Sequence, residues 1–499
     1  MPEDAIRVAA IDLGASSGRV VLGHGTAGGF ALREIHRFAN QPRTADGVLR
    51  WDAAALFAGV LDGLRAAGRE DARLDAVAVD GWGVDYGLLD DDRELIADPA
   101  SYRDPRTGPS YAAVIETAGG QGGVDAARLY EATGIAAHPF NTVFQLMADG
   151  GSAHLQAARH ALLVPDLMTY WLSGRLATEL TNASTTGLLD PRTMTWAAPV
   201  AEALGVPTGL FPRFGAAGER AGPMTASLAT GLGLNRPPQV IIGPSHDTAA
   251  AVAGVPAADE AFAFVCSGTW ALAGVELPAP VITAAGRQAD FTNEVGIDGT
   301  IRFLRNVTGF WLLQECVREW EAQGRRADLD ELTRAAGDVP GRRALIDVQD
   351  PGFAAPGGMT ERITRACLRT SGVTLSAEAE ILRCILDSMA VAIRQAVRDA
   401  IRITGRPVST VHVVGGGVAN PLFCQLTADA CGLPVVAGPT EAASWGNVLV
   451  QARALGVTGG SLPELRSLVR RGTRLTRYRP AEQEAAWERA DEIVLASRC

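Results

Sequence analysis

Arg7-Val-Ala-Ala-Ile-Asp12-Leu-Gly-Ala-Ser-Ser-Gly18-Arg-Val-Val-Leu22 consists of two short apolar runs separated by a small, hydroxyl-rich segment. A short apolar run bounded by turn residues is typical of a buried β-strand. Two such runs joined by a Gly/Ser turn predict a β-hairpin. We therefore expect a hairpin whose turn is exposed at one edge of a sheet, with Asp12 at the end of its first strand.

Strand-like runs alternate with longer helical stretches along the rest of the chain, which is typical of an α/β protein. A helix is predicted over 378–403, where apolar residues recur at helical spacing. The glycine triplet 415–417 separates a predicted strand at 411–414 from a helical run at 422–431. Further strands are expected at 76–80, 161–165 and 240–243.

The opening pattern is repeated near the middle of the 499 residues. After the polar, Pro-marked segment 255–260, an apolar run at 261–266 is followed by the turn Ser267-Gly-Thr269 and a second apolar run. We interpret the repetition as an internal duplication. It predicts two similar domains, 1–254 and 255–499.

The charged residues exclude several classes of protein. The 56 acidic residues exceed the 45 cationic ones, giving a net charge of -11, which disfavours binding to nucleic acid or to anionic lipid. All 45 cations are Arg, because the sequence contains no Lys. Mechanisms that need a lysine amine, such as the Walker A motif or Schiff-base chemistry, are therefore excluded. Any phosphate must be bound by backbone N–H groups, hydroxyls, Arg or a metal.

The compartment is indicated by what the sequence lacks. The N-terminus shows no basic segment followed by an apolar one, and no apolar run approaches the roughly 18 residues that span a bilayer. The seven Cys have no metal-binding spacing. We expect a cytoplasmic protein with mostly reduced thiols, although Cys367 and Cys384 form a possible pair.

Three segments are candidates for phosphate binding. Gly14-Ala-Ser-Ser-Gly18 offers closely spaced backbone N–H groups and two hydroxyls, which suit an anion, although an ordinary hairpin turn would look the same. Asp12 beside it suits a hydrated Mg²⁺ or an Asx-type cap. Thr269 lies in the second turn, and the glycines 415–417 would let a nucleotide approach the backbone at a helix start.

Asp247 is the candidate general base. It follows a strand and a tight turn in Val240-Ile-Ile-Gly-Pro-Ser-His-Asp-Thr248, just before an Ala-rich helical run. A carboxylate near a helix N-terminus is kept ionised by the helix dipole and can accept a hydroxyl proton. The alternative is an ordinary N-cap, a position that Asp favours. His246 does not suit a cap, although a lone His is more often a hydrogen-bonded structural residue.

Aromatic and polar residues occur together in Asp80-Gly-Trp-Gly-Val-Asp-Tyr86, in Tyr102-Arg-Asp-Pro-Arg-Thr107 and in Asn306-Val-Thr-Gly-Phe-Trp311. Sugar pockets combine rings with fixed polar groups in this way. Tryptophans of a hydrophobic core would give the same pattern, so both interpretations stay open at this stage.

The order of the motifs resembles that of the FGGY carbohydrate kinases, within the actin-like ATPase superfamily. The resemblance extends from about Val8 to Arg477. It is carried by Asp12-Leu-Gly-Ala-Ser-Ser-Gly-Arg19, Trp82-Gly-Val-Asp85, Tyr102-Arg-Asp104, Pro139-Phe-Asn-Thr142, Ser245-His-Asp-Thr248, Ser267-Gly-Thr-Trp270, Val414-Gly-Gly-Gly417 and Ala437-Gly-Pro439. The resemblance implies two ribonuclease H-like domains with a central catalytic cleft. Domain 1–254 would bind the sugar and hold the base and first phosphate loop, and domain 255–499 would bind the nucleotide.

The resemblance also implies roles for single residues. Asp247 would be the catalytic proton acceptor, and Asp12 would lie near Mg²⁺, through water. The ketose contacts would be Gly83, His246, Asp247, Thr248 and Asn306. The ATP contacts would be Ala15, Ser16, Ser17, Gly18, Arg19, Thr269, Gln314 and Gly416.

The activity implied is ATP-dependent phosphorylation of L-rhamnulose at O1. The alternatives are a kinase for another ketose, such as L-fuculose or L-xylulose, and a catalytically silent actin-like sugar sensor. The expected partners are the ketose and ATP, with no nucleic acid and no membrane, and the expected state is a monomer or weak homodimer.

Overall fold

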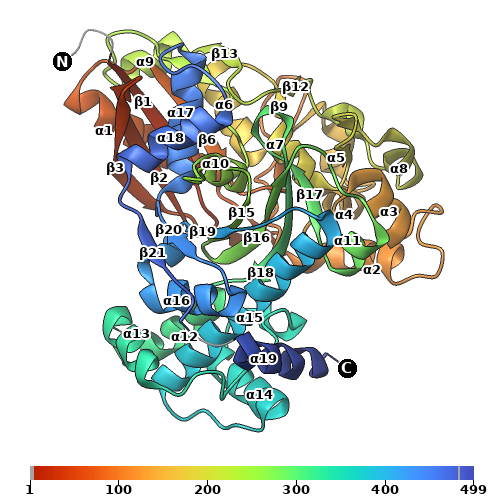
Figure 1. Cartoon of the computed structure of the whole chain (residues 1–499). Coiled ribbons are helices and arrows are strands. Elements are labelled where there is room, and N and C mark those ends of the chain that lie inside the picture. The colour runs from red at the N-terminus through yellow and green to blue at the C-terminus, as the bar shows by residue number, and fades with distance from the viewer. Residues whose placement is uncertain (1–4, 327, 482–483, 499) are drawn as a thin grey trace. The chain divides into compact units, whose positions relative to one another are not determined.

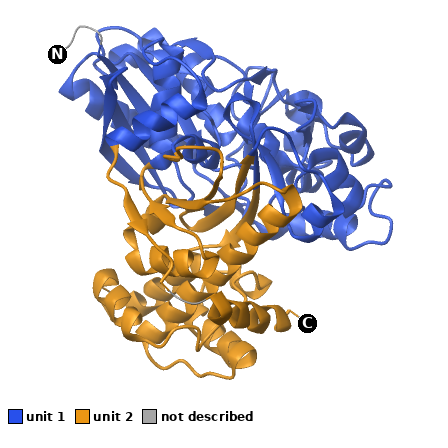
Figure 2. Ribbon diagram, viewed as in Figure 1, with its two compact units in different colours: residues 1–254, 277–303, 442–472 blue, residues 255–276, 304–441, 473–499 orange. Residues whose placement is uncertain are grey.

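A computed structural model describes residues 5–326, 328–481 and 484–498 (Figure 1). The chain forms two compact units (Figure 2). Unit 1 contains residues 1–254, 277–303 and 442–472, and unit 2 contains residues 255–276, 304–441 and 473–499. Two segments from the second half of the sequence, 277–303 and 442–472, thus belong to unit 1, a placement that a division at 254/255 does not include.

Unit 1 is built on a six-stranded sheet with the order β13-β14-β6-β1-β2-β3. The predicted hairpin is present: β1 (Ile6–Leu13) and β2 (Ser17–Thr26) are antiparallel, and β2 pairs with β3 (Gly29–Ala39) in the same sense. On the other side, β6 (Ala76–Gly81) and then β14 (Gln239–Ile241) continue the sheet parallel to β1. The edge strand is β13 (Arg220–Pro223).

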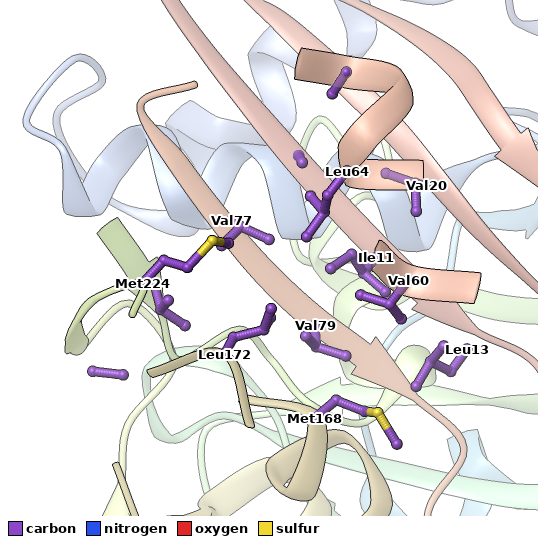
Figure 3. Close-up of a cluster of buried hydrophobic side chains, with 14 of the residues drawn as sticks. Ile11, Leu13, Val20, Val60, Leu64, Val77, Val79, Met168, Leu172 and Met224 are labelled. Carbon is purple, nitrogen blue, oxygen red and sulfur yellow. The ribbon is translucent and has the colours of Figure 1, made fainter. Parts of the chain in front are cut away.

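Helices cover both faces of this sheet because successive side chains of a strand point to opposite faces. Ile11 and Leu13 of β1 pack with α1 (Ala53–Glu70), and Val79 of β6 packs with α6 (Val164–Ser173), as Figure 3 shows. Alternate residues of the same strands pack on α17 (Ala442–Ala454), which lies beside β1 and β6 in Figure 1, and α18 (Leu462–Gly472) covers β3.

Unit 2 repeats the strand pattern. Its sheet has the order β17-β18-β16-β15-β19-β20-β21. The second predicted hairpin, β15 (Phe262–Ser267) with β16 (Trp270–Leu277), is antiparallel, and β19 (Thr410–Val414) and β20 (Val435–Ala437) continue parallel to β15. The same sheet includes β21 (Thr476–Tyr478), β17 (Thr292–Val295), which belongs to unit 1 with the segment 277–303, and β18 (Ile301–Thr308), whose first residues belong to that segment. A hairpin followed by two parallel strands in both sheets is the internal duplication expected from the sequence.

The remaining elements of unit 1 are β4 (Arg43–Ala45), β5 (Val48–Arg50), β7 (Tyr86–Leu89), α2 (Gly108–Ile115), α3 (Ala126–Thr133), α4 (Thr142–Ala148), α5 (Ala153–Ala157), β8 (His160–Leu163), β9 (Thr178–Glu179), α7 (Leu180–Ala183), β10 (Leu189–Asp190), β11 (Thr195–Trp196), α8 (Ala198–Ala203), β12 (Phe214–Gly215), α9 (Ala226–Gly231), α10 (Asp247–Ala253) and α11 (Ala284–Gln288). Unit 2 also contains α12 (Trp311–Ala322), α13 (Leu329–Asp338), α14 (Met359–Ser371), α15 (Glu378–Thr404), α16 (Pro421–Cys431) and α19 (Glu484–Ala496).

Three predicted boundaries differ from the structure. The strand expected at 161–165 ends at Leu163, because Pro165 lies in the first turn of α6, where its missing N–H has no cost. The strand expected at 240–243 ends at Ile241. The glycines 415–417 lead into a 3₁₀ turn, Gly416–Ala419, and α16 begins only after Asn420, whose side chain caps it.

No helix in the described part of the chain is long and apolar enough to cross a bilayer. The six Cys within the described residues are free thiols, and five of them are buried. Cys499 lies outside those residues.

Candidate active site

Three carboxylates follow the carboxyl ends of neighbouring parallel strands in unit 1. Asp12 at the end of β1 is in register with Asp80 at the end of β6. Gly81 then pairs with His246 beyond the end of β14, which places Asp247 at the same edge. The carboxyl ends of parallel strands are where α/β folds bind their ligands. The register of the strands thus brings Asp12, Asp80 and Asp247 to the same edge of the sheet.

Asp12 is held by the hairpin that carries it. Arg19, opposite it on β2, donates from both Nε (2.8 Å) and a terminal nitrogen (2.6 Å) to Oδ2 of Asp12. The turn itself is closed by the hydrogen bond from Gly14 N to Ser17 O, and Asn40 binds it through Gly14 O and Ser16 O. Residues 14–18 therefore form a turn of fixed shape beside a carboxylate.

Asp80 was not among the predicted site residues, although its motif was noted. Its side chain is fully buried. Asn447 of α17 donates to Oδ2 (2.5 Å), while Oδ1 is buried with no partner in the described part of the chain. Burial, and secondarily the charge of Asp12, raises the pKa of Asp80 well above its usual range.

Asp247 is the first residue of α10, and His246 occupies the N-cap without a side-chain hydrogen bond. Asp247 is therefore not a capping residue, which removes the alternative left open by the sequence. Thr248 Oγ1 donates to its Oδ1 (3.1 Å). The side chain remains 33% exposed. The sequence predicted that the helix start keeps Asp247 ionised. In the structure, burial has the larger effect and raises the pKa of Asp247.

His246 lies between Asp247 and a buried ion pair that sequence reasoning missed. Its Nε2 is 3.5 Å from Asp247 Oδ1, and its Nδ1 is 3.1 Å from a terminal nitrogen of Arg302 and 3.3 Å from Glu294 Oε2. Arg302 and Glu294 contact each other at 2.8 Å. Burial acts to raise the pKa of Glu294, but the charge of Arg302, with a smaller contribution from His246, outweighs burial and lowers the pKa below its usual value.

The loop before Asp247 rests on a second buried carboxylate. Glu179 Oε2 accepts from Ser245 N (3.0 Å) and from Thr181 Oγ1 (2.5 Å), and Thr181 Oγ1 accepts from His246 N (3.3 Å). Asp166, in the first turn of α6, accepts from Glu179 N (3.1 Å). Burial, with the neighbouring charge of Glu179, raises the pKa of Asp166 to about 8. This support comes from residues that no sequence motif marked.

The loop around Gly83 is held by the side chains of two threonines, Thr142 and Thr185. Val84 has a φ of 70°, which a β-branched residue rarely adopts. Its N–H donates to Thr185 Oγ1 (3.1 Å), and its carbonyl accepts from Thr142 Oγ1 (2.6 Å). A Cβ on Gly83 would lie 2.8 Å from Thr185 Oγ1, so this position requires glycine.

The aromatic residues near this loop are partly core. Trp51 and Trp82 are buried, with ring centroids 4.5 Å apart, and both donate from Nε1 to Asp85 Oδ2. Burial raises the pKa of Asp85 to about 6, against four hydrogen bonds that lower it. Tyr102 is only partly buried. Trp82 therefore belongs to the core, together with Trp51, which lies outside the aromatic motifs of the sequence.

Unit 2 gathers three of the predicted nucleotide contacts. Cys266 of β15 is in register with Val414 of β19, so the turn 267–269 lies beside the glycines 415–417. Gly415 has a φ of 86°, and a Cβ there would lie 2.7 Å from Ser267 O. Thr269 Oγ1 is 3.4 Å from Gln314 Oε1 of α12. The backbone at Gly415 thus lies so close to the backbone at Ser267 that only glycine fits at position 415.

The predicted site residues fall into two groups. Asp12, Ala15, Ser16, Ser17, Gly18, Arg19, Gly83, His246, Asp247 and Thr248 belong to unit 1, and Thr269, Asn306, Gln314 and Gly416 belong to unit 2. Asn306 lies in β18, where its carbonyl accepts from Gln349 Nε2 (2.7 Å). The register of β1 with β6 could have indicated Asp80. No comparable signal indicates Glu294 or Arg302.

The residues beside Asp12 fit a hydrated Mg²⁺. Carboxylate oxygens are the ligands that this ion prefers, and it keeps several waters. Asp80 Oδ1, buried without a partner, adds a second oxygen at the same edge. The described residues contain no cluster of three or more His, Cys, Asp or Glu able to hold a metal. The protein would therefore supply few direct ligands, as expected for an ion held mainly by water and phosphate.

Comparisons with known proteins agree with this arrangement. The N-terminal domain of the FGGY family of carbohydrate kinases matches residues 7–254, and the C-terminal domain of the same family matches residues 263–455. The chain belongs to the FGGY family of carbohydrate kinases. Among curated proteins it is 38% identical, over 96% of its length and 97% of the relative, to a rhamnulokinase of Bacteroides thetaiotaomicron. It is 39% identical, over 90% of its length and 89% of the relative, to one of Enterococcus faecalis.

Solved structures of other kinases share the fold. A xylulose kinase from Lactobacillus acidophilus aligns with a TM-score of 0.81 at 17% identity, covering 99% of this chain and 97% of that one. A gluconate kinase from the same organism gives 0.80 at 17% identity, covering 99% and 98%. At this identity the likeness concerns the fold alone, the mixed α/β fold with two FGGY domains that the motifs predicted.

Proposed function

We propose that this FGGY kinase transfers the terminal phosphoryl group of ATP to O1 of L-rhamnulose, giving L-rhamnulose 1-phosphate and ADP in L-rhamnose catabolism. The observation that carries the proposal is the position of Asp247, next to His246 and Thr248 at the strand ends that also hold Asp12. The similarity to rhamnulokinases over nearly the whole chain supports the choice of ketose.

Asp247 would accept the O1 proton as O1 bonds to phosphorus and the bond to the ADP oxygen breaks. Burial raises the pKa of Asp247, which makes its carboxylate a stronger base than that of a solvated aspartate. Gly83, His246, Thr248 and Asn306 would position the ketose. The turn 14–18, Thr269, Gln314 and Gly416 would bind ATP without a lysine, through N–H groups, hydroxyls and Arg19.

Asp12 would orient a Mg²⁺ ion through water. When bound, this ion supplies positive charge that offsets the charge developing on the phosphates. Arg19 already holds the carboxylate of Asp12 in one orientation through two hydrogen bonds.

The test is turnover with Mg²⁺ and ATP across L-rhamnulose, L-fuculose and L-xylulose, measured as ADP release, with ³¹P NMR of the product. We expect the highest kcat/KM for L-rhamnulose and a phosphate ester at O1. A higher kcat/KM for another ketose would show that L-rhamnulose is not the preferred substrate. Sugar binding without any turnover would favour the catalytically silent sugar sensor.

A further inference from the structure

The ion pair that contacts His246 is formed by two residues that are distant from it in the sequence, Glu294 and Arg302. Glu294 lies in β17 and Arg302 in β18, both within the segment 277–303 that folds with unit 1. The side chain of Arg302 is completely buried, and those of Glu294 and His246 are each 9% exposed. A buried guanidinium that reaches the residue beside a candidate base calls for an explanation beyond packing.

The guanidinium of Arg302 contacts a carbonyl, an imidazole and a carboxylate. Its Nε (3.2 Å) and one terminal nitrogen (3.0 Å) donate to Val295 O. The same terminal nitrogen lies 3.1 Å from His246 Nδ1, and the other one lies 2.8 Å from Glu294 Oε2. A terminal guanidinium nitrogen carries two hydrogens, so one can reach Val295 O while the second reaches the imidazole.

Guanidinium groups donate hydrogen bonds and never accept them. If Nδ1 of His246 also carried a hydrogen, two N–H groups would face each other across 3.1 Å. In a competing arrangement Nδ1 would donate to Glu294 Oε2, which lies 3.3 Å away. The hydrogen on Nδ1 would then be repelled by the N–H of Arg302. We propose that Arg302 fixes His246 in the tautomer with its hydrogen on Nε2, and that Glu294 serves to neutralise Arg302.

The consequence concerns the orientation of Asp247. The Nε2–H of His246 then faces Asp247 Oδ1 at 3.5 Å, the same oxygen that accepts from Thr248 Oγ1. The hydrogen bond from Thr248 Oγ1 thus reaches Oδ1 and not Oδ2 of Asp247. Arg302 thus acts as a positioning residue through His246, leaving Oδ2 as the oxygen that accepts the O1 proton. This catalytic consequence rests on the proposed function, whereas the tautomer does not.

The tautomer is measured directly by ¹⁵N–¹H correlation NMR of the full chain with ¹⁵N-labelled histidine. Among the seven His, the signal of His246 is identified by its loss in His246→Gln. We expect a bare, pyridine-type Nδ1 and a protonated Nε2. A protonated Nδ1 in the wild-type protein would overturn the proposal, whether or not any turnover is detected.

A variant pair tests the positioning role. Arg302→Lys keeps the charge but cannot reproduce the fork, and Arg383→Lys in α15 is the matched control. Arg383 is also buried, with a carboxylate partner at 3.0 Å and a carbonyl partner at 2.8 Å, but in unit 2.

We expect Arg302→Lys to lower kcat for the ketose by about 10-fold or more, since a misplaced base loses part of its typical ~10²–10⁴-fold contribution. The KM for ATP should be unchanged, and Arg383→Lys should keep wild-type kcat. Equal losses of kcat in both variants would refute the positioning role. If no ketose is phosphorylated at all while the Nε2–H tautomer is observed, the proposed function fails and the tautomer assignment stands.

Discussion

Asp166 makes the stability of this protein depend on pH in a direction opposite to that of most carboxylates. Burial and the neighbouring charge of Glu179 raise the pKa of Asp166 to about 8, from an ordinary value of 3.8. In the unfolded chain this carboxyl group ionises above about pH 4. The folded protein holds the proton up to about pH 8, so unfolding releases a proton throughout this window. The stability contributed by the neutral group is therefore lost as the pH rises.

The size of the effect follows from the shift. The rise in the pKa from 3.8 to about 8, at about 1.4 kcal/mol per pH unit, corresponds to roughly 6 kcal/mol of unfolding free energy between the two ends of the window. Asp166→Asn removes the titration, while the amide oxygen can still accept from Glu179 N. Relative to this variant, the wild-type protein should lose up to about 1.4 kcal/mol per pH unit from pH 4 to 8, and nothing further above pH 8.

The assay is urea unfolding of the wild-type protein and of Asp166→Asn between pH 5 and 9. The difference between their free energies of unfolding is compared at each pH. Asp190→Asn is the control, because the hydrogen bond and charge of Arg192 outweigh burial and lower the pKa of Asp190. The stability difference between this variant and the wild type should stay constant from pH 5 to 9, because the stability that a lowered pKa contributes is lost only as the pH falls below about 4. Parallel stability curves for wild type and Asp166→Asn between pH 5 and 8 would refute the reasoning.

Three further outcomes are expected. Asp247→Asn should lower kcat by about 10²–10⁴-fold with ATP binding retained, checked by calorimetry, and wild-type turnover would exclude it as the base. Thr269→Val should weaken the use of ATP by roughly 1.5–3 kcal/mol in kcat/KM, while a change confined to the ketose KM would move this residue to the sugar pocket. Gly83→Ala should raise the ketose KM about 10-fold or more, since its Cβ would lie 2.8 Å from Thr185 Oγ1. Gly108→Ala, whose Cβ would meet nothing within 4 Å, is its control, and equal KM values for the two variants would contradict the steric argument.

The sequence by itself determined the two hairpins, the α/β class and the duplication. These features are local: an apolar run, a Gly/Ser turn and a second apolar run specify a hairpin wherever they occur. It also indicated Asp247, because a strand, a tight turn and a helix start fix where the residue between them lies. The exclusion of lysine chemistry required only the composition.

The tertiary structure decided which distant residues surround that base. Glu294 and Arg302 reach His246 only because the segment 277–303 folds into unit 1, and Asn447 reaches Asp80 only because the segment 442–472 does. The pKa values of Asp166 and Asp247 likewise depend on burial among residues from several elements. Residue type and spacing report local conformation, whereas desolvation and ion pairing depend on which segments meet in space.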